Sequence, residues 1–349
     1  MPDLQTIRAG NAELPAGSPL VIVLVGATTG IGSYVARAWA DTFAKQGQKL
    51  RVYIVGRNAA RAEVLLKYGR ETSPGSEWRF LQVSDLSVLS EVDKVSEIIT
   101  QQEMESPFAG GPARIDALYL SQAQSPVQAS PVTLEGLDTQ MSLLYYSRMR
   151  FIQNLTPLLL ASPDSAHVIS IFAGSMEDSI PSKGLPIGTP PPGSYGITSV
   201  RRNTTFMKTF FFEELAAKHT GRISFVHIYP GLVDGLGFYS DTQPLWFRVV
   251  WRILKPLLSW YMTSPEVCGQ VMLYLSTKRY PAKRAAAQGD AVARSSQQEV
   301  GGGAYAVWQR GEESKTVSWA KARREDTGKK IWKHTMDVFG RIEKSNLST

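Results

Sequence analysis

The chain has 349 residues, 43% of them hydrophobic, and a single cysteine, Cys268. This is enough for one large α/β domain or two small ones, and one cysteine excludes an internal disulfide and suits a reducing compartment. The first twenty residues lack the basic-then-apolar pattern of a secretory signal, and no apolar run reaches the roughly 18 residues of a transmembrane helix. We therefore expect a cytoplasmic protein without a membrane span.

Part of the net charge of +7 lies at the C-terminus, where the residues from Lys321 onward include eight Lys and Arg and four Asp and Glu. Such a tail could contact nucleic acid or an anionic membrane, or form a solvated helix face. Because no nucleic-acid-binding motif accompanies it, we favour the solvated face and expect no nucleic-acid partner.

Strands and helices are predicted to alternate along the chain. Expected strands are 21–25, 50–55, 78–83, 115–120, 166–172, 222–229 and 304–309, and expected helices start near 34, 58, 88, 133, 194 and 330. This alternation predicts an α/β fold: a doubly wound parallel Rossmann sheet with helices on both faces and a C-terminal helical extension. The expected parts are a flexible segment at 1–18, the Rossmann domain at 19–280 with a lid near 236–262, and a loop, edge strand and helix packed on it at 281–349.

A glycine cluster follows the first strand and precedes helical spacing. Gly26 would allow the turn off the strand, Gly30 the approach of a pyrophosphate, and Gly32 close packing of helix on sheet. The helix N-terminus would then offer N–H groups to the phosphates. The stretch predicts a dinucleotide site.

The end of the second strand bears on the choice of cofactor. An acid there favours NAD, whereas this chain has Arg57 and no acid, which favours the 2′-phosphate of NADP over the alternative of a solvated arginine. Asp85, after the third strand, could bond the adenine amino group or cap the next helix.

Four motifs together resemble the short-chain dehydrogenase/reductase superfamily: the glycine loop, Asp85-Leu86-Ser87, Tyr195 on a late helix, and Pro230-Gly231-Leu232-Val233. The segment from Gly303 to Phe339 resembles a divergent fungal branch, many of whose members lie in secondary-metabolite pathways. The resemblance implies that Tyr195 moves a proton at the substrate oxygen and that NADP(H) is the cofactor. The residues expected to hold it are Gly26, Thr28, Thr29, Gly30, Ile31, Gly32, Arg57, Asp85, Leu86, Tyr195 and Val233.

The catalytic half departs from the family pattern. Ile171 stands at the catalytic serine, Ser199 at the lysine and Leu144 at the helix asparagine. Ser170 is adjacent to Ile171 but should point to the other face of the strand. Without the lysine only about one tyrosine in 10³ is ionised at pH 7, so Tyr195 would be a poor base but a competent acid. This favours reduction of a carbonyl over oxidation of an alcohol.

Other charged residues border the expected cleft. Arg201 or Arg202 could replace the lysine, although they lie two turns from Tyr195 rather than one. Glu177, Asp178 and Asp234 could act as acids, and we favour solvated or capping roles for them. The four histidines have no metal-ligand spacing, so no metal site is expected.

An amphipathic segment from Phe238 to Met262 falls at the family's substrate lid. It could cover a bulky lipophilic substrate, pack as a dimer or core helix, or rest on a membrane surface as a peripheral contact. Two functions stay open: an NADP(H)-dependent reductase of a bulky lipophilic carbonyl compound, or a degenerate relative acting without hydride transfer, as a cyclase, isomerase or binding protein.

Overall fold

The computed structural model describes residues 2–124, 131–172, 184–235, 244–258, 260–285, 292–314, 322–323 and 326–346. Its centre is a seven-stranded sheet in the order β3-β2-β1-β4-β5-β6-β7, with every neighbouring pair parallel. The strands are β1 (Leu20–Val25), β2 (Leu50–Gly56), β3 (Glu77–Gln82), β4 (Ala117–Leu120), β5 (Ala166–Ile171), β6 (Ile223–Ile228) and β7 (Ala304–Val307). The predicted doubly wound sheet is confirmed, and its strands are buried because helices cover both faces.

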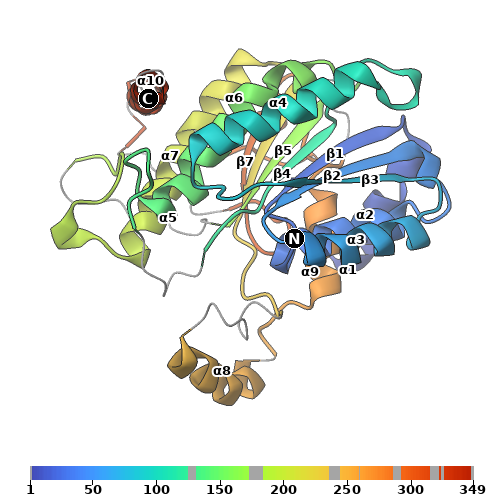
Figure 1. The fold of residues 1–349 in the computed structure, drawn as a ribbon, viewed down its shortest axis with the longest axis horizontal. Helices are drawn as coiled ribbons and strands as arrows, with labels where there is room; N and C mark the ends of the chain where they lie inside the picture. Colours follow the sequence, from blue (N-terminus) through green and yellow to red (C-terminus); the bar gives the residue numbers. More distant parts are fainter. Residues whose placement is uncertain are drawn as a thin grey trace.

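Figure 1 shows the two helical layers. One face carries α4 (Leu89–Glu105), α6 (Ser147–Leu160) and α7 (Ile197–Lys218), and the other α1 (Leu4–Ala12), α2 (Gly30–Thr42), α3 (Ala59–Thr72) and α9 (Pro265–Tyr274). Two further helices, α8 (Leu245–Leu258) and α10 (Thr327–Asn346), lie at the periphery. Side chains alternate across the strands, so the sheet divides the core into two apolar clusters, one under each layer.

The N-terminal segment differs from the expectation of flexibility. Residues 4–12 form α1, whose Ile7 is buried, and the Asn11 side-chain amide donates to the backbone oxygen of Gln270 on α9 at 2.9 Å. Asp3 caps the helix by accepting from the Thr6 N–H at 2.7 Å.

The helix expected from residue 133 begins later, at α5 (Thr139–Met141). Gly136 has a left-handed backbone (φ 76°), and Asp138 caps the helix by accepting from the Met141 N–H at 2.8 Å. A π-helical segment, Ser142–Tyr146, then leads into α6.

The C-terminal helix confirms the expected extension. On α10, the Trp332 ring stacks on Phe211 of α7 at 4.8 Å between centroids, and the Thr335 hydroxyl bonds that of Tyr145 at 2.8 Å. In the described part of the chain, no helix is long and apolar enough to cross a bilayer.

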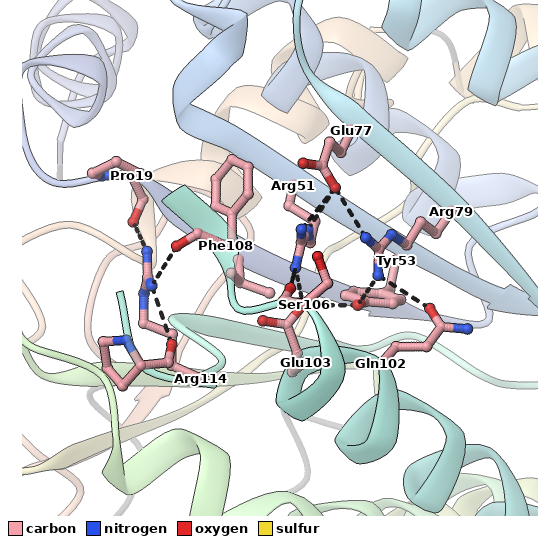
Figure 2. A network of polar contacts seen from close by, with 12 residues as sticks. Pro19, Arg51, Tyr53, Glu77, Arg79, Gln102, Glu103, Ser106, Phe108 and Arg114 are labelled. Carbon is pink, nitrogen blue, oxygen red and sulfur yellow. Dashed lines mark hydrogen bonds and ion pairs between the residues drawn. The ribbon is translucent and has the colours of Figure 1, made fainter. Parts of the chain in front are cut away.

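The amino edge of the sheet is held by buried charge pairs (Figure 2). Arg51, at the start of β2, is 2.8 Å from both Glu77 and Glu103, and Tyr53 donates to Glu103 at 2.7 Å. Arg114 donates to the Pro19 backbone oxygen at 2.6 Å and thus joins β4 to the entry of β1. This edge has a structural role, and the opposite edge is left for the site.

Candidate functional site at the carboxyl edge of the sheet

The candidate site lies at the carboxyl ends of the strands. Strand order reverses between β1 and β4, since the chain runs outward through β2 and β3 and then returns to β4 on the other side. Doubly wound sheets bind their ligands in the crevice beside such a reversal. The predicted nucleotide residues follow β1, β2 and β3, and Tyr195 precedes α7.

The loop after β1 packs too tightly for side chains at two of its glycines. Gly26 has φ 76°, and a Cβ there would lie 2.6 Å from the backbone nitrogen of Gln122. A Cβ on Gly32 would lie 2.6 Å from both Ala27 Cα and Ser121 Oγ. The turn and helix-packing roles predicted for these glycines therefore have a geometric basis.

Gly30 differs, because its φ is 58° and no atom lies within 4 Å of the position its Cβ would take. Beside it the N-cap residue Thr29 makes no side-chain capping bond, and Ser33 Oγ donates to the Gly30 oxygen instead. The first N–H groups of α2 thus receive no cap from the Thr29 side chain, which suits a phosphate site. Thr28 packs under this loop, where a Cβ on Gly56 would lie 2.6 Å from its Cγ2, and Ile31 is half-buried.

Arg57 is exposed immediately after β2, and its guanidinium makes no ion pair with any residue in the described ranges. Only its backbone oxygen is engaged, by Gln82 Nε2 at 3.3 Å. The side chain is therefore available to a ligand phosphate.

Asp85 does not cap α4. Its Oδ1 accepts from the backbone N–H and the hydroxyl of Ser87, both at 2.8 Å, which forms an Asx turn. The helix is capped by Glu135, whose carboxylate accepts from the N–H groups of Leu89 and Ser90 at 2.6 and 2.8 Å. The capping alternative for Asp85 was wrong, because a carboxylate distant in sequence takes that role.

The remaining predicted cofactor residues, Leu86 and Val233, are buried. Val233 pairs with Thr263 in a parallel bridge, and Asp234 forms an ion pair with Lys255 of α8 at 3.0 Å. Asp234 therefore ties the loop after β6 to α8, as a structural contact. Glu177 and Asp178 lie outside the described residues.

The three altered catalytic positions are buried. Ile171 joins the core on the α2 and α9 face, Leu144 the core on the α6 and α7 face, and Ser199 Oγ donates to the Gly196 oxygen at 2.9 Å. Ser170 points away from Ile171, as predicted, and accepts from Arg148 at 2.8 Å. None of these three residues can supply the proton relay of the usual tetrad.

Tyr195 is 39% exposed, and its hydroxyl donates to Asp138 Oδ2 at 2.7 Å. Asp138 thus binds the tyrosine with one oxygen and caps α5 with the other. Asp138 was not predicted as a site residue. An aspartate at the start of a helical pattern, as here, usually indicates a helix cap alone.

Arg148 is a buried cation, also not anticipated. It donates to the backbone oxygens of Gln122, Ile171 and Leu143 at 2.7, 2.5 and 2.9 Å, so it holds together the ends of β4 and β5. Burial lowers the pKa of its guanidinium to about 9. An arginine on the apolar face of a predicted helix was the available signal.

The proposed replacement of the lysine by Arg201 or Arg202 stays a prediction. The Arg201 guanidinium lies 5.8 Å from the ring centre of Phe172 and 5.6 Å from that of Tyr229, which places it over aromatic faces.

Burial lowers the pKa of His167 to about 4 and of His227 to about 3. Within the described residues, no cluster of three His, Cys, Asp or Glu could hold a metal ion.

Comparison with known proteins decides the family. No family model matches the chain. A protein named short-chain dehydrogenase/reductase SAT2 from Stachybotrys chartarum is 51% identical over all of this chain and 99% of its own length. The chain belongs to the short-chain dehydrogenase/reductase family. The resemblance inferred from its motifs is thereby confirmed.

Two further matches are a relative named as an oxidoreductase and a solved structure with the same fold. Oxidoreductase AN1596 of Emericella nidulans is 31% identical over 97% of this chain and 98% of its own. Among solved structures, L-sorbose reductase from Gluconobacter frateurii, complexed with NADPH and L-sorbose, superposes with a TM-score of 0.56 at 18% identity over 85% of this chain and 97% of its own. The structural match supports the fold.

Proposed function

We propose that this short-chain dehydrogenase/reductase is an NADP(H)-dependent reductase of a bulky, lipophilic carbonyl compound. The observation that carries the proposal is the nucleotide cradle: a glycine loop open at Gly30, an uncapped helix N-terminus behind it, and an exposed Arg57 at the end of β2. These are the features that pyrophosphate and a 2′-phosphate require.

The cradle assigns distinct tasks to its residues. Gly26 and Gly32 would hold the loop against the sheet, while the N–H groups near Thr29, Gly30 and Ile31 would donate to phosphate oxygens. Arg57 would bind the 2′-phosphate, and the Asp85 turn and Leu86 would border the adenine. Val233 would flank the nicotinamide end. The structure of the L-sorbose reductase contains NADPH, and that of an angucycline ketoreductase contains NADP. These two complexes support this choice of cofactor.

Tyr195 would be the proton donor. When bound, NADPH supplies a hydride to the carbonyl carbon, and the electrons of the C=O bond move to oxygen. The Tyr195 hydroxyl would then leave Asp138 and give its proton to that oxygen, which is a much stronger base than a phenolate. The hydrogen bond to Asp138 would hold the Tyr195 ring in position, and because it stabilises the protonated phenol it would disfavour use of the tyrosine as a base.

The nature of the substrate is inferred from the elements next to the site. The loop after β6 leads into α8, whose side chains are largely apolar. The names of the matched fungal oxidoreductases, together with a ketoreductase of the angucycline type among the structural matches, support a place in secondary metabolism.

The test is turnover with a panel of bulky ketones, followed by loss of NADPH absorbance. Tyr195→Phe should lower kcat about 10²–10⁴-fold, since it removes the proton donor, and should change NADPH binding far less. A variant with wild-type kcat would overturn the role of Tyr195.

The replacements at Ile171, Ser199 and Leu144 favour a second candidate, proton transfer or cyclisation without net hydride transfer. In that case NADPH would not be consumed while product forms, and a shape-driven cyclisation would survive Tyr195→Phe. Product analysis beside the absorbance trace separates the two functions.

A further inference from the structure

Helix α8 has an apolar face that is exposed in the described part of the chain. Ile253 and Leu257 are 66% and 67% exposed, Trp246 and Val249 are exposed beside them, and Trp260, just after the helix, is 83% exposed. At 100° per residue, the exposed apolar side chains of α8 span about half of its circumference. A continuous exposed apolar surface on one helix indicates a site that a binding partner covers.

The other side of α8 is attached to the domain. Lys255 pairs with Asp234 in the loop after β6 at 3.0 Å, and Trp251, whose ring stacks with that of Phe247 of the same helix at 6.3 Å between centroids, is buried. Figure 1 shows α8 projecting from the body of the protein, below the layer of α1 and α9. The helix is therefore held by one face while its apolar face is presented outward.

The charges on α8 have one sign. It contains Arg248, Arg252 and Lys255 and no acid. Arg252 lies two turns after Leu245, so it borders the exposed apolar face, and it makes no ion pair with any residue that the structure describes. A partner must therefore combine an apolar interior with anionic groups at its boundary.

We propose that α8 docks this protein on an anionic phospholipid bilayer. The helix is about 21 Å long, too short to span a hydrocarbon core of about 30 Å but suited to lie in the interface. Its apolar face enters the acyl region, Arg252 contacts lipid phosphates, and Trp246, Trp260 and Tyr261 lie at headgroup level, where aromatic rings are favoured.

A second copy of the chain fits this face less well. A two-fold contact would join two α8 helices that contain no acid, so neither helix could offer a carboxylate to Arg252 of the other copy. A bilayer with anionic headgroups would bury the apolar face in its acyl region and offer lipid phosphates to Arg252.

The test is co-sedimentation of the full chain with vesicles of phosphatidylcholine, alone or mixed with phosphatidylserine. The wild type should bind the mixed vesicles, more weakly at high salt. Ile253→Glu and Leu257→Glu should each weaken binding about tenfold or more, because a buried aliphatic side chain is lost. Arg252→Gln should weaken binding to the mixed vesicles about fivefold.

Val64→Glu is the matched control, since Val64 is 60% exposed on α3 and should bind as the wild type does. Thermal melting of each variant confirms that it is folded. Three outcomes overturn the proposal: no wild-type binding to mixed vesicles, unaltered binding by the two glutamate variants, or a wild-type dimer that Ile253→Glu dissociates without any vesicle binding. Vesicle binding needs no turnover, so failure of the proposed reductase activity would leave this test unaffected.

Discussion

The carboxyl edge of the sheet has two halves, which keep the family motif to different extents. One half follows β1, β2 and β3, and the other follows β4, β5 and β6. In the first, the glycine loop, Arg57 and Asp85 occupy the positions that the family motif predicts. In the second, Ile171, Ser199 and Leu144 stand at the positions where the resemblance leads us to expect catalytic side chains, and all three are buried.

The difference has a physical reason. The nucleotide half works through backbone groups at close packing, so that a single Cβ at Gly26 or Gly32 would collide with the neighbouring loop. The catalytic half works through side chains, which can be exchanged if the core stays filled. Polar contacts in this half include that of Tyr195 with Asp138 and those of the buried Arg148.

The largest effect is expected from Gly26→Ala in the nucleotide half. Its Cβ would lie 2.6 Å from Gln122 N, on a backbone with φ 76°, so the turn must shift and NADPH binding should be lost. Nicotinamide fluorescence measures the binding. Gly193→Ala is the control, because open space surrounds that glycine and its φ is not in the left-handed region. Wild-type affinity of Gly26→Ala for NADPH would show that the nucleotide half tolerates substitution as well as the catalytic half does.

Arg57→Ala should weaken NADPH binding about 10–100-fold, the value of charge-assisted bonds to a phosphate, and leave NADH binding unchanged. The control is Arg61→Ala, another exposed arginine four residues on, in α3. Equal losses for NADPH and NADH would contradict a 2′-phosphate contact.

Asp138→Ser tests the new contact in the catalytic half. Serine still caps α5 but does not offer Tyr195 a carboxylate, so kcat for ketone reduction should fall about fivefold with little change in melting temperature. In the Tyr195→Phe background the same substitution should have no further effect, since the hydroxyl is already absent. An equal loss in both backgrounds would assign Asp138 a purely structural role.

Acid is expected to weaken the fold. All four histidines lie beyond β4, and burial lowers the pKa of His227 on β6 to about 3. Since the unfolded side chain has a pKa near 6.5, the unfolded state binds more protons between these values, and stability falls as pH drops below about 6.5. His227→Gln should reduce the loss of unfolding free energy between pH 7 and pH 5 by about 2 kcal/mol, measured by urea titration. An unchanged loss would contradict a neutral buried His227.

The periodicity of the chain predicted all seven strands and the C-terminal helix, because each carries its own apolar pattern. It missed α1, whose order depends on contact with α9, and it placed the start of α5 too early, because an apolar spacing continues through the Gly136 turn. The glycine loop was predictable because its constraints are local. Asp138 and the Glu135 cap were not, since their partners, Tyr195 and Leu89, are distant in sequence.

The most direct test of an NADP(H) site is equilibrium titration of the wild-type protein with NADPH and with NADH, followed by nicotinamide fluorescence. We expect saturable, micromolar binding of NADPH and binding of NADH weaker by about tenfold or more. Failure to bind either nucleotide would contradict such a site, because the carboxyl edge of β1 to β3 would then be an inherited architecture without its ligand.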